Sequence, residues 1–181
     1  MIKITIPAGE FYDEKSGEFI YFKEISISLE HSLLSISKWE SKWHKPFLSK
    51  LKTDSKTNEE VIDYIRCMTI TQGIPESVYY GLTEDNIKTI NKYIRNPMTA
   101  TTVKDDGKRS SEIVTSELIY YWMVALEIPF ECEKWHINRL LTLIKICNAK
   151  NKPGKKMGRK ATMKRNSSLN AARRKRMGSK G

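Results

Sequence analysis

Positive charge is concentrated at one end of this 181-residue chain, and this segregation limits how the chain can fold. Residues 150–181 contain 13 Lys and Arg and no Asp or Glu. Residues 1–149 contain 19 basic and 21 acidic residues, a net charge of −2. A block of like charges repels itself, so we expect it to stay extended until an anionic partner neutralises it. The sequence therefore predicts a globular body, 1–149, followed by a basic, flexible tail, 150–181.

The basic tail has two interpretations. It could be a solvated segment that only aids solubility, or it could contact phosphates or an acidic protein. A surface of mixed sign gives solubility equally well, so the segregation favours contact with an anion. Residues 166–176 contain good helix formers and could fold on a partner. The residues that we expect to contact the anion are Lys155, Lys156, Arg159, Lys160, Lys164, Arg165, Arg173, Arg174, Lys175 and Arg176.

The composition of the body excludes several classes of protein. Hydrophobic residues make up 39% of the chain and charged residues 29%, which is enough to bury a core. The apolar run 118–126 is far shorter than the roughly 20 residues that span a membrane. The N-terminus lacks the apolar segment of a signal peptide, and three scattered cysteines suit a reducing compartment. We expect a soluble cytoplasmic protein without a membrane partner.

Alternation of apolar and polar residues predicts β structure at the N-terminus. Residues 2–6, 19–22 and 25–29 have strand-like patterns, and 13–17 supplies turn residues, with Gly17 able to adopt positive φ. We expect a small antiparallel sheet of two or three strands.

Helical spacing dominates the rest of the body. A helix is predicted from residue 33 until Pro46 stops it, and Thr57 with Glu60 forms a capping-box pattern that begins another. A short helix is expected over 75–81. Thr83 should cap the next helix, which Asn96 and Pro97 end.

Three further elements complete the predicted body. Residues 98–103 and 112–115 are expected to form a β-hairpin with an exposed tip. Residues 116–126 are apolar almost all round, which predicts a buried central helix, and 131–149 predicts a second strong helix. The expected fold class is α+β, mostly α: a small N-terminal antiparallel β element and a β-hairpin packed on a helical body, with a basic C-terminal extension.

No set of residues in the sequence suits catalysis. Phosphate-binding glycine loops and the nucleophile motif of hydrolases are absent. Cys132 and His136 are four residues apart, as metal ligands sometimes are, but zinc needs about four ligands and no second pair exists. Structural roles are favoured for both. We therefore predict a protein that is not an enzyme, with no catalytic residues, no metal and no cofactor.

Trp39 and Trp43 share a helix face, with Lys38, Lys42 and Lys45 close by. Such a group could stack bases and contact phosphates. A tryptophan pair at this spacing is more often core or partner interface, which is the interpretation we favour.

Three stretches of the body resemble a known family: 31–47 (HSLLSISKWESKWHKPF), 119–126 (IYYWMVAL) and 128–144 (IPFECEKWHINRLLTLI). The family consists of small proteins encoded among the structural genes of long-tailed bacteriophages and termed tail assembly chaperones. The resemblance includes the basic end, 170–176 (NAARRKR). It implies no catalytic residue and no cofactor.

The resemblance also implies a role in the host cytoplasm. A protein of this family keeps the long, helical tape-measure protein soluble until tube subunits polymerise around it. This role requires apolar grooves that bind helices and does not require catalysis. Two alternatives stay open: a nucleic-acid-binding phage protein, such as a head or connector component or a regulator, that uses the basic tail, and an inhibitor of a host factor. Homo-oligomerisation and presence in the virion also stay open.

Overall fold

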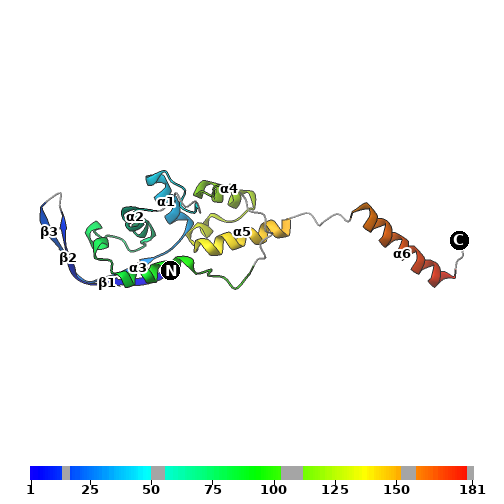
Figure 1. The fold of residues 1–181 in the computed structure, drawn as a ribbon, viewed down its shortest axis with the longest axis horizontal. Coiled ribbons are helices and arrows are strands. Elements are labelled where there is room, and N and C mark those ends of the chain that lie inside the picture. Colours follow the sequence, from blue (N-terminus) through cyan, green and yellow to red (C-terminus); the bar gives the residue numbers. More distant parts are fainter. Residues whose placement is uncertain (14–16, 50–55, 103–111, 152–157, 179–181) are drawn as a thin grey trace. The chain divides into compact units, whose positions relative to one another are not determined.

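The structure is a computed structural model that describes residues 1–13, 17–49, 56–102, 112–151 and 158–178. The chain divides into two compact units, Met1–Asn148 and Ala149–Gly181. The first unit contains two small antiparallel sheets of two strands each and most of the helices (Figure 1). The predicted fold class, α+β and mostly α, is confirmed.

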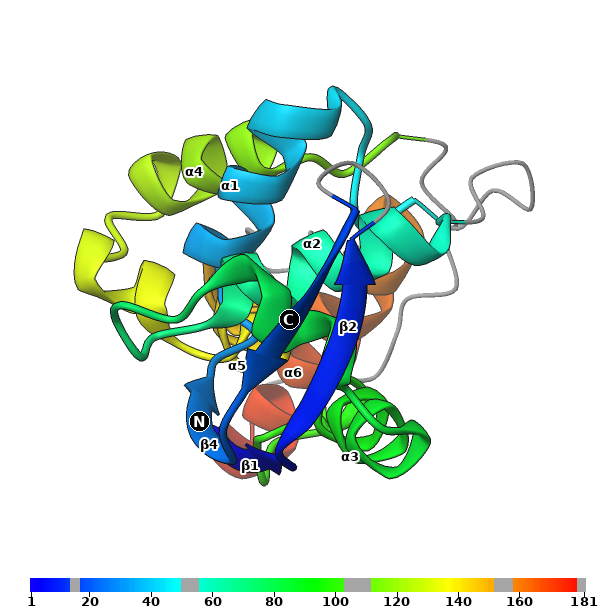
Figure 2. The same cartoon turned by 90° about the vertical axis from the view of Figure 1, so that its left-hand side faces the viewer.

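The N-terminal strands form a two-stranded ribbon in two parts, which Figure 2 shows from the side. The strands are β1 (Ile2–Ile6), β2 (Gly9–Asp13), β3 (Glu18–Phe22) and β4 (Ile25–Leu29). β1 pairs with β4, and β2 pairs with β3. Ile6 lies opposite Ile25 and Gly9 opposite Phe22, so the second ladder continues the register of the first. Pro7 lies at the break between them, and it has no N–H for a ladder hydrogen bond.

One of these strands was not predicted. β2 contains Gly9, Glu10 and Asp13, which are poor strand formers, and it exists because β3 supplies its hydrogen-bond partners. Gly17 has φ +71°, which confirms the expected positive φ at the turn.

The second and third α-helices begin at the predicted caps, Thr57 and Thr83. In α2 (Asn58–Met68), the Thr57 hydroxyl accepts from the Glu60 amide and the Glu60 carboxylate accepts from the Thr57 amide, so the capping box is confirmed. Thr83 caps α3 (Glu84–Arg95), which ends at Asn96 as predicted. A short 3₁₀ helix, η1 (Glu76–Gly81), precedes it.

α1 (Leu33–Trp43) begins at Ser32, which forms a capping box with Ser35. It ends at His44, whose φ of +52° lies in the left-handed region. A buried carboxylate holds this helix to its neighbours: Glu40 accepts hydrogen bonds from the Phe47 amide at 2.7 Å and from the Ser116 amide at 2.7 Å. Glu40 therefore joins α1 to the next loop and to the start of α4 (Ser116–Ala125).

The core of the first unit lies where the β1–β4 ladder meets the helices. Alternate residues of β1 and β4 enter it, as their period-two pattern requires. The largest fully buried side chains are those of Ile6, Ile27, Leu29, Leu33, Ile36, Trp39, Ile65, Met68, Ile90, Ile119, Met123 and Ile137.

Residues 116–126 were predicted to form a buried central helix. The helix is present, but it is neither central nor fully buried. α4 packs against α1 at the periphery of this unit, as both views show (Figures 1 and 2). Ser116, Ile119 and Met123 are buried, whereas Tyr121 is 65% exposed and Val124 is 61% exposed. An apolar pattern all round a helix does not distinguish complete burial from an apolar face that the body leaves uncovered.

The helix predicted over 131–149 is two elements. A 3₁₀ helix, η2 (Phe130–Lys134), comes first and α5 (Ile137–Asn151) follows. Between them the Ile137 amide donates to the His31 carbonyl at 2.7 Å, and His136 forms an isolated bridge with Ser32. These bonds to the start of α1 replace the helical bonds that a continuous helix would make.

The predicted β-hairpin at 98–115 is wrong in the part that the structure describes. Residues 98–102 and 112–115 are not strands, and 103–111 lies outside the described residues. Local side-chain bonds take the place of a ladder: Asn96 accepts from the Met98 amide at 2.9 Å and Thr99 from the Thr101 amide at 3.1 Å. The hairpin of this fold is instead β2–β3 at the N-terminus.

The described part of the second unit beyond α5 is one helix, α6 (Arg159–Met177), which Gly178 ends in a left-handed conformation. The sequence led us to expect helix over 166–176 only when a partner is bound, whereas here Arg159–Met177 is helical in the chain alone. Every residue of α6 is exposed. The helix extends beyond 166–176 toward the N-terminus, and none of its residues is buried.

Candidate interaction surfaces

The α6 helix brings together eight of the ten residues that were predicted to contact an anion. The other two, Lys155 and Lys156, lie outside the described residues. The eight form two groups that flank the uncharged stretch 166–172. They are Arg159, Lys160, Lys164, Arg165, Arg173, Arg174, Lys175 and Arg176.

These cations surround α6 and do not line one face of it. Successive helical residues are rotated by about 100°, so Arg159, Lys164 and Arg165 alone point in directions that differ by about 100° or more. The apolar side chains Met163 and Leu169 lie among them and remain 64% and 47% exposed. The helix therefore presents positive charge to any direction from which an anion approaches.

The electrostatics of α6 favour an anionic partner. Its first turn contains no acidic residue and begins with Arg159 and Lys160, where the positive end of the helix dipole disfavours cations. Lys160 and Lys164 add a like-charge pair at i,i+4. Both repulsions would be relieved by an anion at this end.

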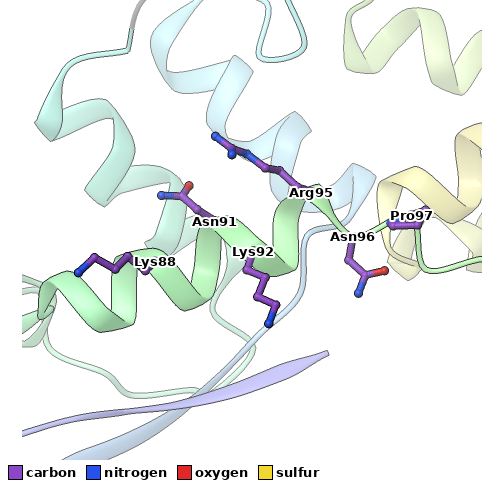
Figure 3. A pocket seen from close by; sticks show the side chains of 6 residues that line it. All are labelled: Lys88, Asn91, Lys92, Arg95, Asn96 and Pro97. Carbon is purple, nitrogen blue, oxygen red and sulfur yellow. The ribbon is translucent and has the colours of Figure 1, made fainter.

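A second cationic surface lies on the body and was not predicted. An open hollow of about 580 Å³ is lined by Lys88, Asn91, Lys92, Arg95, Asn96 and Pro97. Figure 3 shows these side chains spreading from α3 and the segment that follows it. Lys88 already pairs with Glu84 and Asp85, each at 3.5 Å. The sequence signal was the spacing of Lys88, Lys92 and Arg95, which places three cations on one side of the helix.

The two tryptophans that were predicted to be core or partner interface differ in burial. Trp39 is 1% exposed and its indole N–H donates to the Glu60 carbonyl at 2.9 Å, so it is a core residue and not a partner interface. Trp43 is half-buried and donates to the Asp63 carboxylate at 2.8 Å. A partner contact at Trp43 stays a prediction.

The lysines beside the tryptophans are also engaged. Lys42 pairs with Asp63 at 2.6 Å and Lys45 with Glu60 at 2.5 Å. Hydrogen bonding to Lys45 lowers the pKa of the Glu60 carboxyl, which keeps this pair ionised. These two cations are therefore neutralised within the body and offer little to phosphate.

Two histidines form a buried cluster. The His31 and His136 rings meet edge to face with centroids 5.1 Å apart. His31 Nδ1 is hydrogen-bonded to the Tyr64 hydroxyl, and His136 Nε2 donates to the Tyr93 carbonyl at 3.1 Å. Burial, with the neighbouring His136, lowers the pKa of His31 to about 3, and burial also lowers that of His136. Both rings are therefore neutral packing groups.

Potential metal ligands do not cluster among the described residues, and two of the cysteine thiols have raised pKa values. No group of three potential metal ligands occurs among them. The Cys132 thiol is buried, and burial raises its pKa. Cys67 lines a hollow of about 660 Å³ with Lys38, Ser35 and Glu30, but burial raises its pKa as well. A protonated thiol is a poor nucleophile.

Exposed apolar side chains gather on two parts of the first unit. On the β2–β3 hairpin, Tyr12, Phe19 and Tyr21 share the outer face, with the first two rings 5.0 Å apart. On α4 and η2, the exposed residues Tyr121, Val124 and Phe130 form the second group. Sequence analysis missed both, because a strand or helix pattern alone does not tell which apolar faces a body covers.

Comparisons with known proteins found no matching family model, no matching curated protein and no matching solved structure. Among the described residues, no helix is both long enough and apolar enough to cross a membrane.

Proposed function

We propose that this protein is a non-enzymatic factor of phage tail assembly that acts in the host cytoplasm as a chaperone of the tape-measure protein. One observation supports this best: a folded, nearly neutral body with exposed apolar surface is joined to a separate, fully exposed cationic helix. This combination suits reversible binding of a long client, with apolar contacts to the body and electrostatic contacts to α6.

The two parts have different roles in this proposal. The body supplies most of the affinity, because apolar burial is the main favourable term in protein association. The α6 helix speeds encounter with acidic stretches of the client, and this contribution is screened by salt. Deletion of 150–181 should therefore slow association and weaken its salt response without abolishing binding.

A second candidate function is nucleic-acid binding through the tail. It is favoured by the distribution of cations around the whole of α6, which suits a groove that has phosphates on both sides. If about 6–10 of the 13 cations in 150–181 contact phosphates, affinity should fall by roughly 10³–10⁵ between 50 mM and 200 mM salt. Deletion of 150–181 should then abolish binding.

The deciding experiment compares three proteins: the full chain, residues 1–149, and a full-length variant with the eight α6 cations replaced by Gln. The last is the matched control, because Gln keeps the length and helix propensity while removing charge. Each is tagged and purified after nuclease treatment from cells that co-express the tape-measure protein. Each is also titrated with double-stranded DNA and with RNA at about physiological salt.

Recovery of the tape-measure protein with all three proteins, together with weak nucleic-acid binding, would support the chaperone role. Absence of the tape-measure protein from the full-length purification would overturn it. Tight nucleic-acid binding by the full chain, lost in both the 1–149 form and the Gln variant, would then establish the second function.

A further inference from the structure

The outer side of α4 is apolar, and no other described part of the first unit covers it. We define the α4 face as Tyr121, Val124 and Ala125, together with Phe130 of η2. Tyr121, Val124 and Phe130 are 65%, 61% and 56% exposed, and Ala125 is exposed as well. The Tyr120 and Phe130 rings lie 6.4 Å apart, which joins η2 to α4.

The composition of α4 distinguishes this face from an ordinary solvent-exposed helix side. A surface helix has charged or polar residues opposite its buried stripe. In α4 the buried stripe consists of Ser116, Ile119 and Met123, and the only charged residue of the whole helix is Glu117. Contiguous exposed apolar residues with a polar rim mark an interaction surface.

The geometry of the face suits a helical partner. The backbone groups of α4 are bonded within the helix, so a partner strand cannot add to it as it would to a sheet edge. Tyr121, Val124 and Ala125 have the i, i+3, i+4 spacing that forms a ridge on a helix, and such ridges pack into the grooves of another helix. A helix also brings no unpaired backbone groups into the apolar contact.

The charges around the face indicate the chemistry of the partner. Between residues 112 and 133 there are five Glu and no Lys or Arg. Glu117 begins the exposed stripe, and Glu127 and Glu131, which lie within three residues of Phe130 in the sequence, are exposed. Hydrogen bonds from its own backbone N–H and from Thr115 lower the pKa of Glu117, so it is ionised at neutral pH. A nucleic acid would be repelled here, whereas basic side chains would be attracted.

We propose that the α4 face binds an amphipathic helix whose apolar side is bordered by Lys or Arg. This inference deepens the proposed function and rests on it for the identity of the client: the face would receive a helical segment of the tape-measure protein. It assigns apolar client contacts to α4 and η2, and it leaves α6 free to contact acidic stretches of the same client.

The test uses two synthetic peptides and the full-length protein. One peptide is an amphipathic helix of about 18 residues with a leucine face bordered by lysines, and its twin has glutamates in place of the lysines. Binding is measured by fluorescence anisotropy for wild type, for the double variant Tyr121→Lys and Val124→Lys, and for Tyr21→Lys. Tyr21 is the matched control, because it is a similarly exposed tyrosine, 73% against 65% for Tyr121, and belongs to the other apolar group, on the β2–β3 hairpin.

We expect the lysine-bordered peptide to bind the wild type and to lose at least tenfold in affinity in the double variant, with no change in Tyr21→Lys. Glu127→Lys should weaken binding severalfold by removing an attractive charge. The glutamate-bordered peptide, attracted by α6, should bind both variants as it binds the wild type. All substituted residues are exposed, so the variants should fold, and circular dichroism checks that they do. If the double variant unfolds, the single variant Tyr121→Gln takes its place.

Unchanged affinity of the lysine-bordered peptide in the α4 variant would overturn the proposal, and so would an equal loss in Tyr21→Lys. Because this test uses peptides and not the tape-measure protein, its result is independent of the co-purification. The full-length protein could recover the tape-measure protein while the α4 variant binds the lysine-bordered peptide as tightly as the wild type does. That result would support the chaperone role and reject only the proposal that the α4 face binds the client.

Discussion

Acidification should destabilise the fold through His31 before most carboxylates titrate. This ring is 2% exposed, hydrogen-bonded to Tyr64 and packed edge to face on His136. Its pKa is about 3 in the folded chain, against 6.5 for an ordinary histidine. Because the pKa is lower in the folded state, the unfolded state binds the proton first. Stability is therefore complete above about pH 6.5 and falls as the pH drops toward 3.

The size of this effect follows from the two pKa values. Between pH 7.5 and pH 5, the unfolded chain gains a proton at His31 that the folded chain does not accept. The linkage relation gives a loss of about 2 kcal/mol in the free energy of unfolding from this residue. His136 adds to the loss with the same sign, because burial lowers its pKa too.

The measurement is urea unfolding at a series of pH values from 8 to 4.5. Unfolding is monitored by tryptophan fluorescence, which reports on the core because Trp39 is buried. The test variant is His31→Gln, and the control is His44→Asn, which removes an exposed histidine at a left-handed position that asparagine tolerates. We expect a shallower pH dependence in His31→Gln and an unchanged one in His44→Asn. Equal slopes in wild type and His31→Gln would refute the reasoning.

Three further substitutions test the packing of the first unit by urea unfolding. Glu40→Ala leaves two backbone amides without their carboxylate and should cost about 3 kcal/mol; a loss below about 1 kcal/mol would mean that water replaces it. Thr57→Ala removes the cap of α2 and should cost about 1 kcal/mol, with Thr57→Ser close to wild type. In Gly81→Ala the new methyl group meets the Phe22 ring, so a loss of about 1–3 kcal/mol is expected; an unchanged midpoint would show that the ring moves freely.

The predictable parts of the fold are those whose secondary structure is determined by residues close together in the sequence. Thr57 and Thr83 begin helices because their hydroxyls satisfy backbone amides within three residues, and no distant contact is needed. The strand patterns of 2–6 and 25–29 were equally clear, because alternate isoleucines enter the core.

The parts that were not predictable depend on contacts between distant segments. The interruption at His136 arises because the Ile137 amide bonds to His31, more than one hundred residues earlier. The spacing of apolar residues in 131–149 gives no sign of that hydrogen bond. Likewise, Glu40 is buried because it bonds to the amide of Ser116, which follows it by 76 residues.

The candidate sites divide in the same way. Positive charge on α6 was predictable, because composition alone locates a cation block. The exposed side of α4 was not, since the sequence shows that Tyr121 and Val124 are apolar but not which way the helix is turned. The cations on α3 could have been found from the spacing of Lys88, Lys92 and Arg95, but only the fold shows that they line a hollow.

The broken ribbon at the N-terminus has a consequence for how this chain tolerates change in length. In a continuous ladder, a shift of one residue would move every isoleucine of β1 and β4 from the core to solvent. Because pairing stops at Pro7 and resumes at Gly9, a misalignment that begins in β2–β3 can end at the gap. The outer hairpin can therefore lengthen or shorten in related sequences while the inner ladder keeps its alignment, which makes it the part of the body where a short epitope or a fluorescent label could be inserted.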